Sequence, residues 1–469
     1  MAYDDVVSAE DAGARFVVLD PADGSVIAHA PDLGVEAADA AVLRAREAFE
    51  AWSRRSAFER AALLLRWRQS LESQAEDLAR LITREQGKPL AEARGEVAYG
   101  LSFIDWFAAE GLRLQGMTIP SHLEGSSLTA QPVPLGVAAA ITPWNFPFAM
   151  ITRKAAAALA AGCTVVVKPS PETPLTALAI EAAARTAGLE AGVFCVLTGR
   201  DDALGSALVR HPKVSAVSFT GSTAVGRRIL AEAGVKRVLL ELGGHAPFIV
   251  MADADPVKAA ADCAAAKFVT SGQDCLAANR IFVHRSLEEV FVRELTARAR
   301  ALRVGPGDAP QTDLGPLIHE RQLDHCLEQI EDALAKGARL VTGGRRLPGA
   351  GAFLAPTVLA DVNEDMRLFH EETFGPVAPV IVFDDEDEVV RRANDSTYGL
   401  AAYIQTRDLE RARRLQSRLE YGMVAVNTAR MTGPPVPFGG LKASGLGREG
   451  SSQGLRDFTD IKYLCLHHG

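Results

Sequence analysis

The first third of the chain carries the pattern of amphipathic helices. Alanine and leucine recur at helical spacing, and arginine and glutamate occupy the opposite positions. The pattern changes near Gly116, where apolar residues begin to gather in short strand-like runs. The sequence therefore predicts helices over residues 36–52, 57–86 and 90–110, and strands over residues 127–133 and 136–142.

From residue 136 onward, short β-branched runs alternate with alanine-rich helical stretches. The alternation continues in a second region that starts at Pro247. Alternating strands and helices are typical of parallel sheets covered by helices on both faces. We therefore expect an α/β fold. The predicted strands include residues 164–168, 192–197, 214–220, 237–241, 248–250 and 280–284.

Composition narrows the function classes. The chain has 469 residues, 48% hydrophobic content and a formal net charge of −9, which disfavours a nucleic-acid partner. No apolar run reaches the length of a membrane span, and the acidic N-terminal segment lacks the apolar region of a signal peptide. Six scattered cysteines do not make a disulfide framework. We expect a cytoplasmic protein with no membrane partner.

Three polar residues suggest chemistry on a carbonyl group. Cys275 follows a glycine turn, Glu241 precedes Leu242 and two glycines, and Asn145 lies among aromatics in residues 143–147. A thiol, a carboxylate and an amide donor are groups that covalent catalysis on a carbonyl uses. The other cysteines lie in apolar or helical surroundings, where free cysteine is usually inert.

A candidate phosphate cradle follows the predicted strand 214–220. Gly221 and Ser222 come next and a helix begins, so free backbone N–H groups would point at an anion. Lys168 ends another strand, at the sheet edge where α/β proteins bind ligands. An ordinary turn and a solvent-facing strand end remain the alternatives. The literal G-x-G-x-x-G at 445–450 follows no strand, so we do not assign it to a nucleotide.

Seven motifs together resemble the aldehyde dehydrogenase superfamily, in its order and over essentially the whole chain. Within the superfamily the chain is most similar to the succinate-semialdehyde dehydrogenase branch, notably in the segments MITRK, KPSPETPLTAL and GLGREGSS. The motifs are PWNFP at 143–147, VVVKPS at 165–170, FTGST at 219–223, ELGG at 241–244, GQDC at 272–275, EETFGP at 371–376 and PFGG at 437–440.

The resemblance implies roles for the three polar residues. Cys275 would attack the aldehyde carbon, and Asn145 would hold the resulting oxyanion together with the Cys275 backbone N–H. Glu241 would activate the water that hydrolyses the thioester. A cysteine-dependent esterase using the same thiol is the alternative from a different class of enzyme.

The resemblance also implies NAD or NADP as cofactor and no metal. Pro171 stands where many NAD-preferring relatives carry a ribose-binding glutamate, so NADP use stays open. The residues expected around the cofactor are Trp144, Lys168, Ser170, Pro171, Gly221, Ser222, Leu242, Glu372 and Phe374.

The substrate residues depart from the branch. An arginine that grips the substrate carboxylate is replaced by Val269, and Ala277 removes the second cysteine of a redox switch. Arg153 and Arg430 remain as candidate anion clamps, whereas Asp274 would repel an anion. A small semialdehyde such as succinate semialdehyde is the expected substrate, and a neutral or amino-aldehyde is the alternative.

By resemblance the fold is that of aldehyde dehydrogenases, with two Rossmann-like α/β domains and a small bridging β element. The cofactor domain would comprise residues 1–115 and 136–243, and the catalytic domain residues 244–444. Residues 116–135 and 445–469 would form the bridge. The lone strand predicted near its end needs a partner sheet, so we expect a homodimer or homotetramer.

Overall fold

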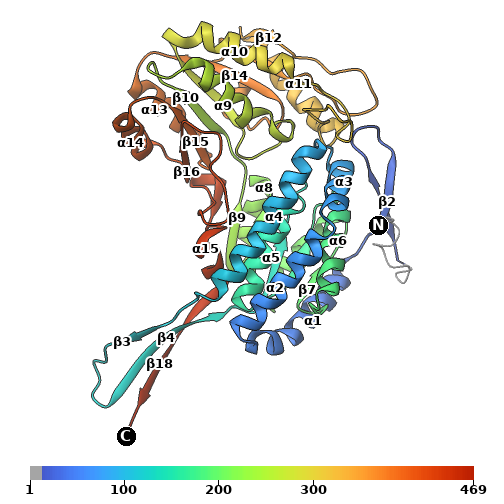
Figure 1. Cartoon of the computed structure of the whole chain (residues 1–469), viewed down its shortest axis with the longest axis vertical. Coiled ribbons are helices and arrows are strands. Elements are labelled where there is room, and N and C mark those ends of the chain that lie inside the picture. Colours follow the sequence, from blue (N-terminus) through green and yellow to red (C-terminus); the bar gives the residue numbers. More distant parts are fainter. Residues whose placement is uncertain (1–12) are drawn as a thin grey trace.

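The computed structural model describes residues 13–469 and confirms the expected α/β fold (Figure 1). Two α/β bodies lie next to each other, and a thin antiparallel arm leaves one of them. Residues 1–12, which include the acidic N-terminal segment discussed above, lie outside the described residues. No helix within residues 13–469 is long and apolar enough to cross a membrane.

The first body is built on a six-stranded sheet in the order β17-β9-β8-β5-β6-β7, parallel except at its β17 edge. Alternate residues of each strand face opposite helix layers. Ala138 and Ala140 of β5 pack in the core with α2 to α6, whereas Val137 and Ala139 pack with α1, α7 and α8. The strands are β5 Val137–Ile141, β6 Thr164–Lys168, β7 Phe194–Val196, β8 Val214–Thr220, β9 Arg237–Glu241 and β17 Gly445–Leu446. The helices are α1 Val35–Arg54, α2 Ala57–Glu72, α3 Ala75–Gln86, α4 Leu90–Gly111, α5 Ala149–Ala161, α6 Pro174–Thr186, α7 Asp202–Arg210, α8 Thr223–Ala233 and α15 Ser451–Arg456.

One predicted helix is two helices in the structure. The segment 57–86 divides into α2 and α3 after Glu72. The apolar pattern continues across the break because Leu71 and Leu78 enter the same core. A capping box starts α2: the Ser56 Oγ atom accepts from the Glu59 N–H, and the Glu59 carboxylate accepts from the Ser56 N–H. The structure also contains a hairpin that the pattern did not predict, β1 Arg15–Leu19 with β2 Val26–Pro31.

The second body has a seven-stranded sheet in the order β12-β13-β14-β11-β10-β15-β16, parallel except at β12. It confirms the second alternating region. Its strands are β10 Ala246–Val250, β11 Ala278–His284, β12 Arg339–Thr342, β13 Thr357–Ala360, β14 Val377–Phe383, β15 Ala401–Gln405 and β16 Met423–Val426. Its longer helices are α9 Pro256–Phe268, α10 Glu288–Ala301, α11 Glu320–Ala335, α13 Glu386–Asn394 and α14 Leu409–Arg418, and α12 is the short turn Arg367–His370.

The arm is a three-stranded sheet in the order β18-β4-β3. The predicted terminal strand is β18 Thr459–His467, and it pairs along its whole length with β4 Ser126–Pro134, which also pairs with β3 Met117–Ile119. The segment before β18 belongs elsewhere: β17 pairs with β9, and α15 packs on α4 and α5. The proposed division into three domains stays a prediction at these boundaries.

Strand register places the candidate residues of the first body at one sheet edge. Ile141 of β5 pairs with Lys168 of β6 and with Phe219 of β8, and Thr220 pairs with Glu241 of β9. The carboxyl ends of four parallel strands therefore meet at the same level. This edge faces the second body and is the place where open α/β sheets bind ligands.

Candidate active site

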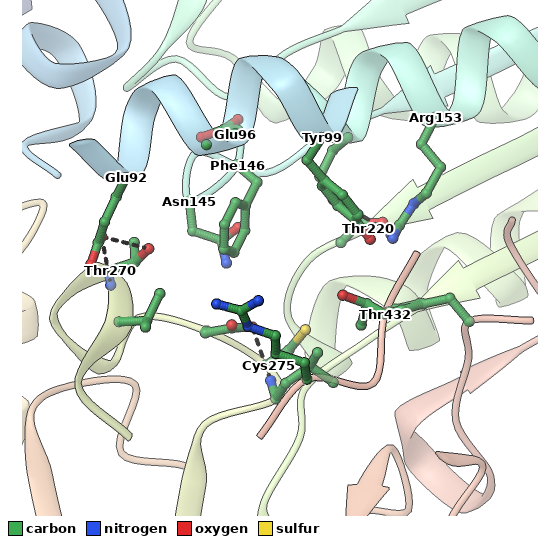
Figure 2. A pocket seen from close by; sticks show the side chains of 17 residues that line it. Glu92, Glu96, Tyr99, Asn145, Phe146, Arg153, Thr220, Thr270, Cys275 and Thr432 are labelled. Carbon is green, nitrogen blue, oxygen red and sulfur yellow. Dashed lines mark hydrogen bonds between the residues drawn. The ribbon is translucent and has the colours of Figure 1, made fainter. Parts of the chain in front are cut away.

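Cys275 lies where two cavities meet. The larger cavity, of about 460 Å³, is lined partly by α4 and α5, and Figure 2 shows it. The smaller cavity, of about 270 Å³, lies beside β8, β9 and the segment around Glu372. Cys275, Asn145 and Thr220 line both cavities. The thiol can therefore be reached by two different molecules from two sides.

A strained turn carries Cys275. Thr270 and Ser271 have φ angles of 51° and 57°, in the left-handed region that side chains rarely adopt. The Glu92 carboxylate of α4 accepts from the Thr270 backbone N–H at 2.9 Å, and the Ser271 hydroxyl donates to the Gly315 carbonyl at 2.8 Å. These contacts offset the strain and fix the direction of the thiol.

Asn145 is held from both sides. Its backbone carbonyl accepts from the Lys88 ammonium at 2.7 Å, and the same ammonium lies 2.6 Å from a Glu96 carboxylate oxygen. Glu96 also accepts from the Phe148 N–H at 2.8 Å. The Asn145 side-chain Nδ2 atom donates to the Gln273 carbonyl at 3.0 Å, two residues before Cys275. The amide group is therefore oriented next to the thiol.

Glu241 ends β9 with a buried carboxylate. Its Oε2 atom has no hydrogen-bond partner among the described residues. Burial, followed by the nearby Glu449 carboxylate, raises the pKa of Glu241 well above its ordinary value, although Arg153 and Lys154 act in the opposite direction. A carboxyl group that is costly to ionise and has no partner is suited to gaining and losing a proton.

The thiol of Cys275 is also hard to ionise in the free protein. Burial raises its pKa well above the ordinary value, and the Asp274 and Glu372 carboxylates raise it further. Asp274 does not point away from the site, because it lines the larger cavity. Its Oδ1 atom accepts from the Leu276 backbone N–H at 3.0 Å. The thiol is thus protonated at neutral pH until positive charge or a base approaches.

The smaller cavity offers groups that can bind an anion and hydroxyl groups. The Ser222 hydroxyl accepts from the Val225 N–H at 3.4 Å and starts α8, whose N-terminus offers backbone donors to an anion. The Glu372 carboxylate, which can bind hydroxyl groups, accepts from the Gly244 N–H at 2.8 Å. A Cβ atom on Gly243 would lie 2.7 Å from a Glu372 carboxylate oxygen, so a larger residue here would require the Glu372 side chain to move. Predicted cofactor residues that line the cavity are Trp144, Gly221, Ser222, Leu242, Glu372 and Phe374.

The remaining predicted cofactor residues lie outside the smaller cavity, along the same sheet edge. Lys168 ends β6, and burial lowers the pKa of its ammonium, against the attraction of Asp202 and Glu172. The Ser170 hydroxyl donates to the Glu172 carboxylate, and Pro171 lies between them. Their roles toward the cofactor stay predictions.

The three predicted substrate residues all line the larger cavity. Arg153, Asp274 and Arg430 lie there together with Val269. Figure 2 shows Arg153 at one side and Glu92 with Thr270 at the other, with the Cys275 sulfur between them in this view. Arg153 is already paired, since its Nε atom lies 2.6 Å from a Glu449 carboxylate oxygen.

Several lining residues had no recognisable signal in the sequence. Gln322 and His325 of α11 line the smaller cavity, and Glu92 and Tyr99 of α4 line the larger one. They lie on long helices whose patterns indicate only packing. Only Lys88, which lies between a glycine and a proline just before α4, stands out in the sequence near these helices. It lines neither cavity, but its side chain is buried.

A thiol between two cavities, one of them beside a helix N-terminus, is the arrangement expected of an oxidoreductase that works through a covalent intermediate. Residues 7–464 match the model of the aldehyde dehydrogenase family. The chain belongs to this family, whose members oxidise aldehydes with NAD or NADP as acceptor.

Similar proteins cover nearly the whole chain. A non-phosphorylating aspartate-semialdehyde dehydrogenase of Halomonas elongata is 52% identical over 97% of this chain and 93% of its own. A succinate-semialdehyde dehydrogenase (NADP) of Escherichia coli is 48% identical over 97% of this chain and 95% of its own. The crystal structure of an aldehyde dehydrogenase from Brucella melitensis biovar abortus superimposes with a TM-score of 0.96, at 47% identity, over 99% of this chain and 96% of that chain.

Proposed function

We propose that the protein oxidises a small acid-bearing aldehyde, a semialdehyde, to the carboxylic acid through a thioester on Cys275. The observation that supports this most directly is the position of Cys275 at the junction of the two cavities. A substrate in the larger cavity and a cofactor in the smaller one can then both reach the same carbon atom.

Attack on the aldehyde needs a thiolate and a donor for the oxyanion. The Cys275 sulfur bonds to the aldehyde carbon, and the carbonyl oxygen takes the negative charge as a thiohemiacetal. The Asn145 side-chain amide, fixed through Lys88 and Gln273, donates to this oxygen together with the Cys275 backbone N–H. Each such donor contributes on the order of 3 kcal/mol to lowering the barrier.

The smaller cavity would hold the oxidant. NAD or NADP, when bound, would supply a hydride acceptor for the aldehyde carbon. Glu372 would hold hydroxyl groups of the cofactor and the N-terminus of α8 its phosphates, and the rings of Trp144 and Phe374, 5.5 Å apart, line the same cavity.

Hydrolysis of the thioester needs a base near Cys275. Ionised Glu241 takes a proton from water, which then attacks the thioester carbon and releases the acid and the thiol. The raised pKa of Glu241 makes the carboxylate a stronger base than an exposed glutamate. The buried pair of Arg153 and Glu449 lies close enough to influence its charge.

One unpaired arginine supports an acid-bearing substrate. Arg430 lines the cavity that ends at Cys275, whereas Arg153, which also lines it, is paired with Glu449. The similar enzymes named above act on aspartate semialdehyde and succinate semialdehyde, which are both acid-bearing aldehydes. A neutral or amino-aldehyde, and ester hydrolysis by the same thiol, are the alternatives to test.

The first experiment compares wild-type protein with Cys275→Ala. We expect oxidation of succinate semialdehyde to fall by roughly 1,000-fold or more, because no other group can form the thioester. NADH or NADPH formation is followed at 340 nm, with each acceptor tested separately. Cys465→Ala, which removes an exposed thiol on β18, is the matched control and should retain activity.

The outcomes separate the alternatives. Full oxidation by Cys275→Ala would refute the nucleophile assignment. Acid formation from an ester without NAD or NADP, faster than aldehyde oxidation, would favour the hydrolase instead.

We also propose that the protein is a homodimer or homotetramer in the cytoplasm. Apolar side chains along β18 are exposed in the single chain, which supports burial against another subunit. All six cysteines are free thiols, as is usual in a reducing compartment.

A further inference from the structure

We propose that the larger cavity recognises an aldehyde that carries both a carboxylate and an ammonium group, an amino-acid semialdehyde. Arg430 binds the carboxylate and Asp274 binds the ammonium. The inference rests on the proposed function and narrows the substrate class of the same site. It is based on which charged groups around the cavity already have partners within the protein and which do not.

Most of the charges around the cavity are neutralised by neighbours. The Arg153 Nε atom lies 2.6 Å from a Glu449 carboxylate oxygen, with both side chains at most 5% exposed. The same guanidinium lies 4.3 Å from the centre of the Phe438 ring. Lys88 and Glu96 form a second buried pair at 2.6 Å. These groups hold the wall together and have little charge left for a ligand.

Arg430 is the cation without a partner. It lines the larger cavity, and among residues 13–469 its guanidinium makes no hydrogen bond or ion pair; only its backbone N–H donates, to the Thr428 hydroxyl at 3.1 Å. A guanidinium binds a carboxylate with two parallel hydrogen bonds. Val269 lines the same wall and offers no charge. The carboxylate of the substrate is therefore assigned to Arg430.

Asp274 is an acid group that a purely anionic substrate would leave uncompensated. Its Oδ1 atom accepts from the Leu276 N–H, and the Cys275 thiol is a further hydrogen-bond partner. Lys88 and Arg153 attract it from a distance, but no ammonium or guanidinium of the described residues is bonded to it. Glu92 lies on the same lining and adds a second acid; burial, with a smaller contribution from Asp274 and against the attraction of Lys88, raises its pKa to about 7. An ammonium group beside Asp274 relieves this repulsion, whereas a second carboxylate would increase it.

The test uses four small aldehydes that differ only in the two charged groups. Aspartate semialdehyde has both groups, succinate semialdehyde only the carboxylate, 3-aminopropanal only the ammonium, and butanal neither. Values of kcat/KM are measured with the full-length enzyme at saturating NAD or NADP. We expect kcat/KM for aspartate semialdehyde to exceed that for succinate semialdehyde by roughly 10-fold or more, which is the effect of one hydrogen bond to a charged group.

Two variants assign the groups. Asp274→Asn should reduce the ratio of kcat/KM for aspartate semialdehyde over succinate semialdehyde by roughly 10-fold. Arg430→Gln should reduce kcat/KM for both acid-bearing aldehydes relative to kcat/KM for 3-aminopropanal and butanal. An effect of a substitution on the thiol itself changes kcat/KM for all four aldehydes by the same factor, so it leaves these ratios unchanged. Arg407→Gln removes an arginine that lines neither cavity, and all ratios should then stay unchanged.

The results can overturn the inference in three ways. Wild-type preference for succinate semialdehyde would do so, and so would an equal effect of Asp274→Asn on all four aldehydes, which indicates a structural role. Better turnover, in general, of acid-bearing aldehydes that carry neither a hydroxyl nor an ammonium group would contradict the ammonium subsite at Asp274. Oxidation of none of these aldehydes would contradict the proposed function itself.

Discussion

At the scale of single residues, the site depends on charges that the fold keeps out of water. Cys275 and Glu241 both have raised pKa values, chiefly through burial. Asp274 adds negative charge directly beside the thiol and makes its ionisation more costly. The free enzyme is thus held in a state in which its nucleophile is protected by its own proton.

Removing the Asp274 charge should make the thiol more reactive. In Asp274→Asn the thiolate loses a repulsive neighbour, so the pKa of Cys275 falls and more thiolate is present at any pH below it. We expect inactivation by iodoacetamide at pH 7.5, without cofactor, to be roughly 3- to 10-fold faster. The pH profile of the inactivation rate should move to lower pH.

Asp262→Asn is the control, since it removes a carboxylate that lies near the site but is paired with Lys258 at 2.5 Å. An unchanged profile in Asp274→Asn would show that the carboxylate does not influence the thiol.

The motifs predicted several of the residues that gather at the two cavities, whereas the roles of these residues stay predictions. The glycine turn before Cys275, the aromatic segment around Asn145 and the strand end at Gly221 each appeared in the sequence, and the structure brings them to one place. Charge pairing could not be predicted. Arg153 reads as a free anion clamp in the sequence, and only the fold reveals Glu449 beside it, nearly 300 positions further along.

At the scale of elements, the cofactor cavity depends on how closely α8 approaches β9. Gly226 of α8 packs against Leu242, which lines the smaller cavity. A Cβ atom at position 226 would lie 2.3 Å from a Leu242 methyl carbon. The side chain or the helix would have to shift.

Gly226→Ala should therefore weaken cofactor binding. Displacement of Leu242 into the cavity should raise the Kd for NAD or NADP by roughly 10-fold. This corresponds to part of the free-energy cost that is usual for an overpacked core, because the rest is taken up by shifts elsewhere in the protein. Titration of tryptophan fluorescence without aldehyde measures this directly. Gly95→Ala, where an added Cβ meets nothing within 4 Å, should leave the Kd unchanged. Equal affinity of both variants would contradict the role of this contact.

Periodicity predicted many of the helices and strands of both sheets, but it did not predict β12 or β13, nor how the helices are divided. The segment 57–86 reads as one helix because Leu71 and Leu78 share a core, and nothing in the pattern indicates the break between α2 and α3. The short β17 was not predicted either. Its Gly445 belongs to the literal glycine motif, yet it pairs with Glu241 at the sheet edge and does not line the cofactor cavity.

At the scale of the whole molecule, the arm is the least protected part. Within residues 13–469, β18 carries several large apolar side chains that are more than half exposed, and one of its edges is covered by β4 alone. An exposed apolar strand of this kind tends to associate with another protein chain. The residues concerned are Ile461, Tyr463, Leu464 and Leu466.

Charges on β18 should shift the protein toward smaller assemblies. Leu464 and Leu466 point to the same face, two residues apart. We expect Leu464→Lys combined with Leu466→Lys to lower the mass measured by light scattering after gel filtration at micromolar concentration. Leu409→Lys changes an exposed leucine of α14 and should leave the mass unchanged. A wild-type mass equal to one chain would contradict the proposed oligomer.

The meeting of the two cavities has a kinetic consequence. Their linings share only Cys275, Asn145 and Thr220 among the described residues. A dead-end acid that fills the larger cavity should compete with the aldehyde yet leave the apparent affinity for NAD or NADP nearly unchanged. Such a result would mean that neither cavity has to be filled before the other, and that the acid product can depart while the reduced dinucleotide is still in place.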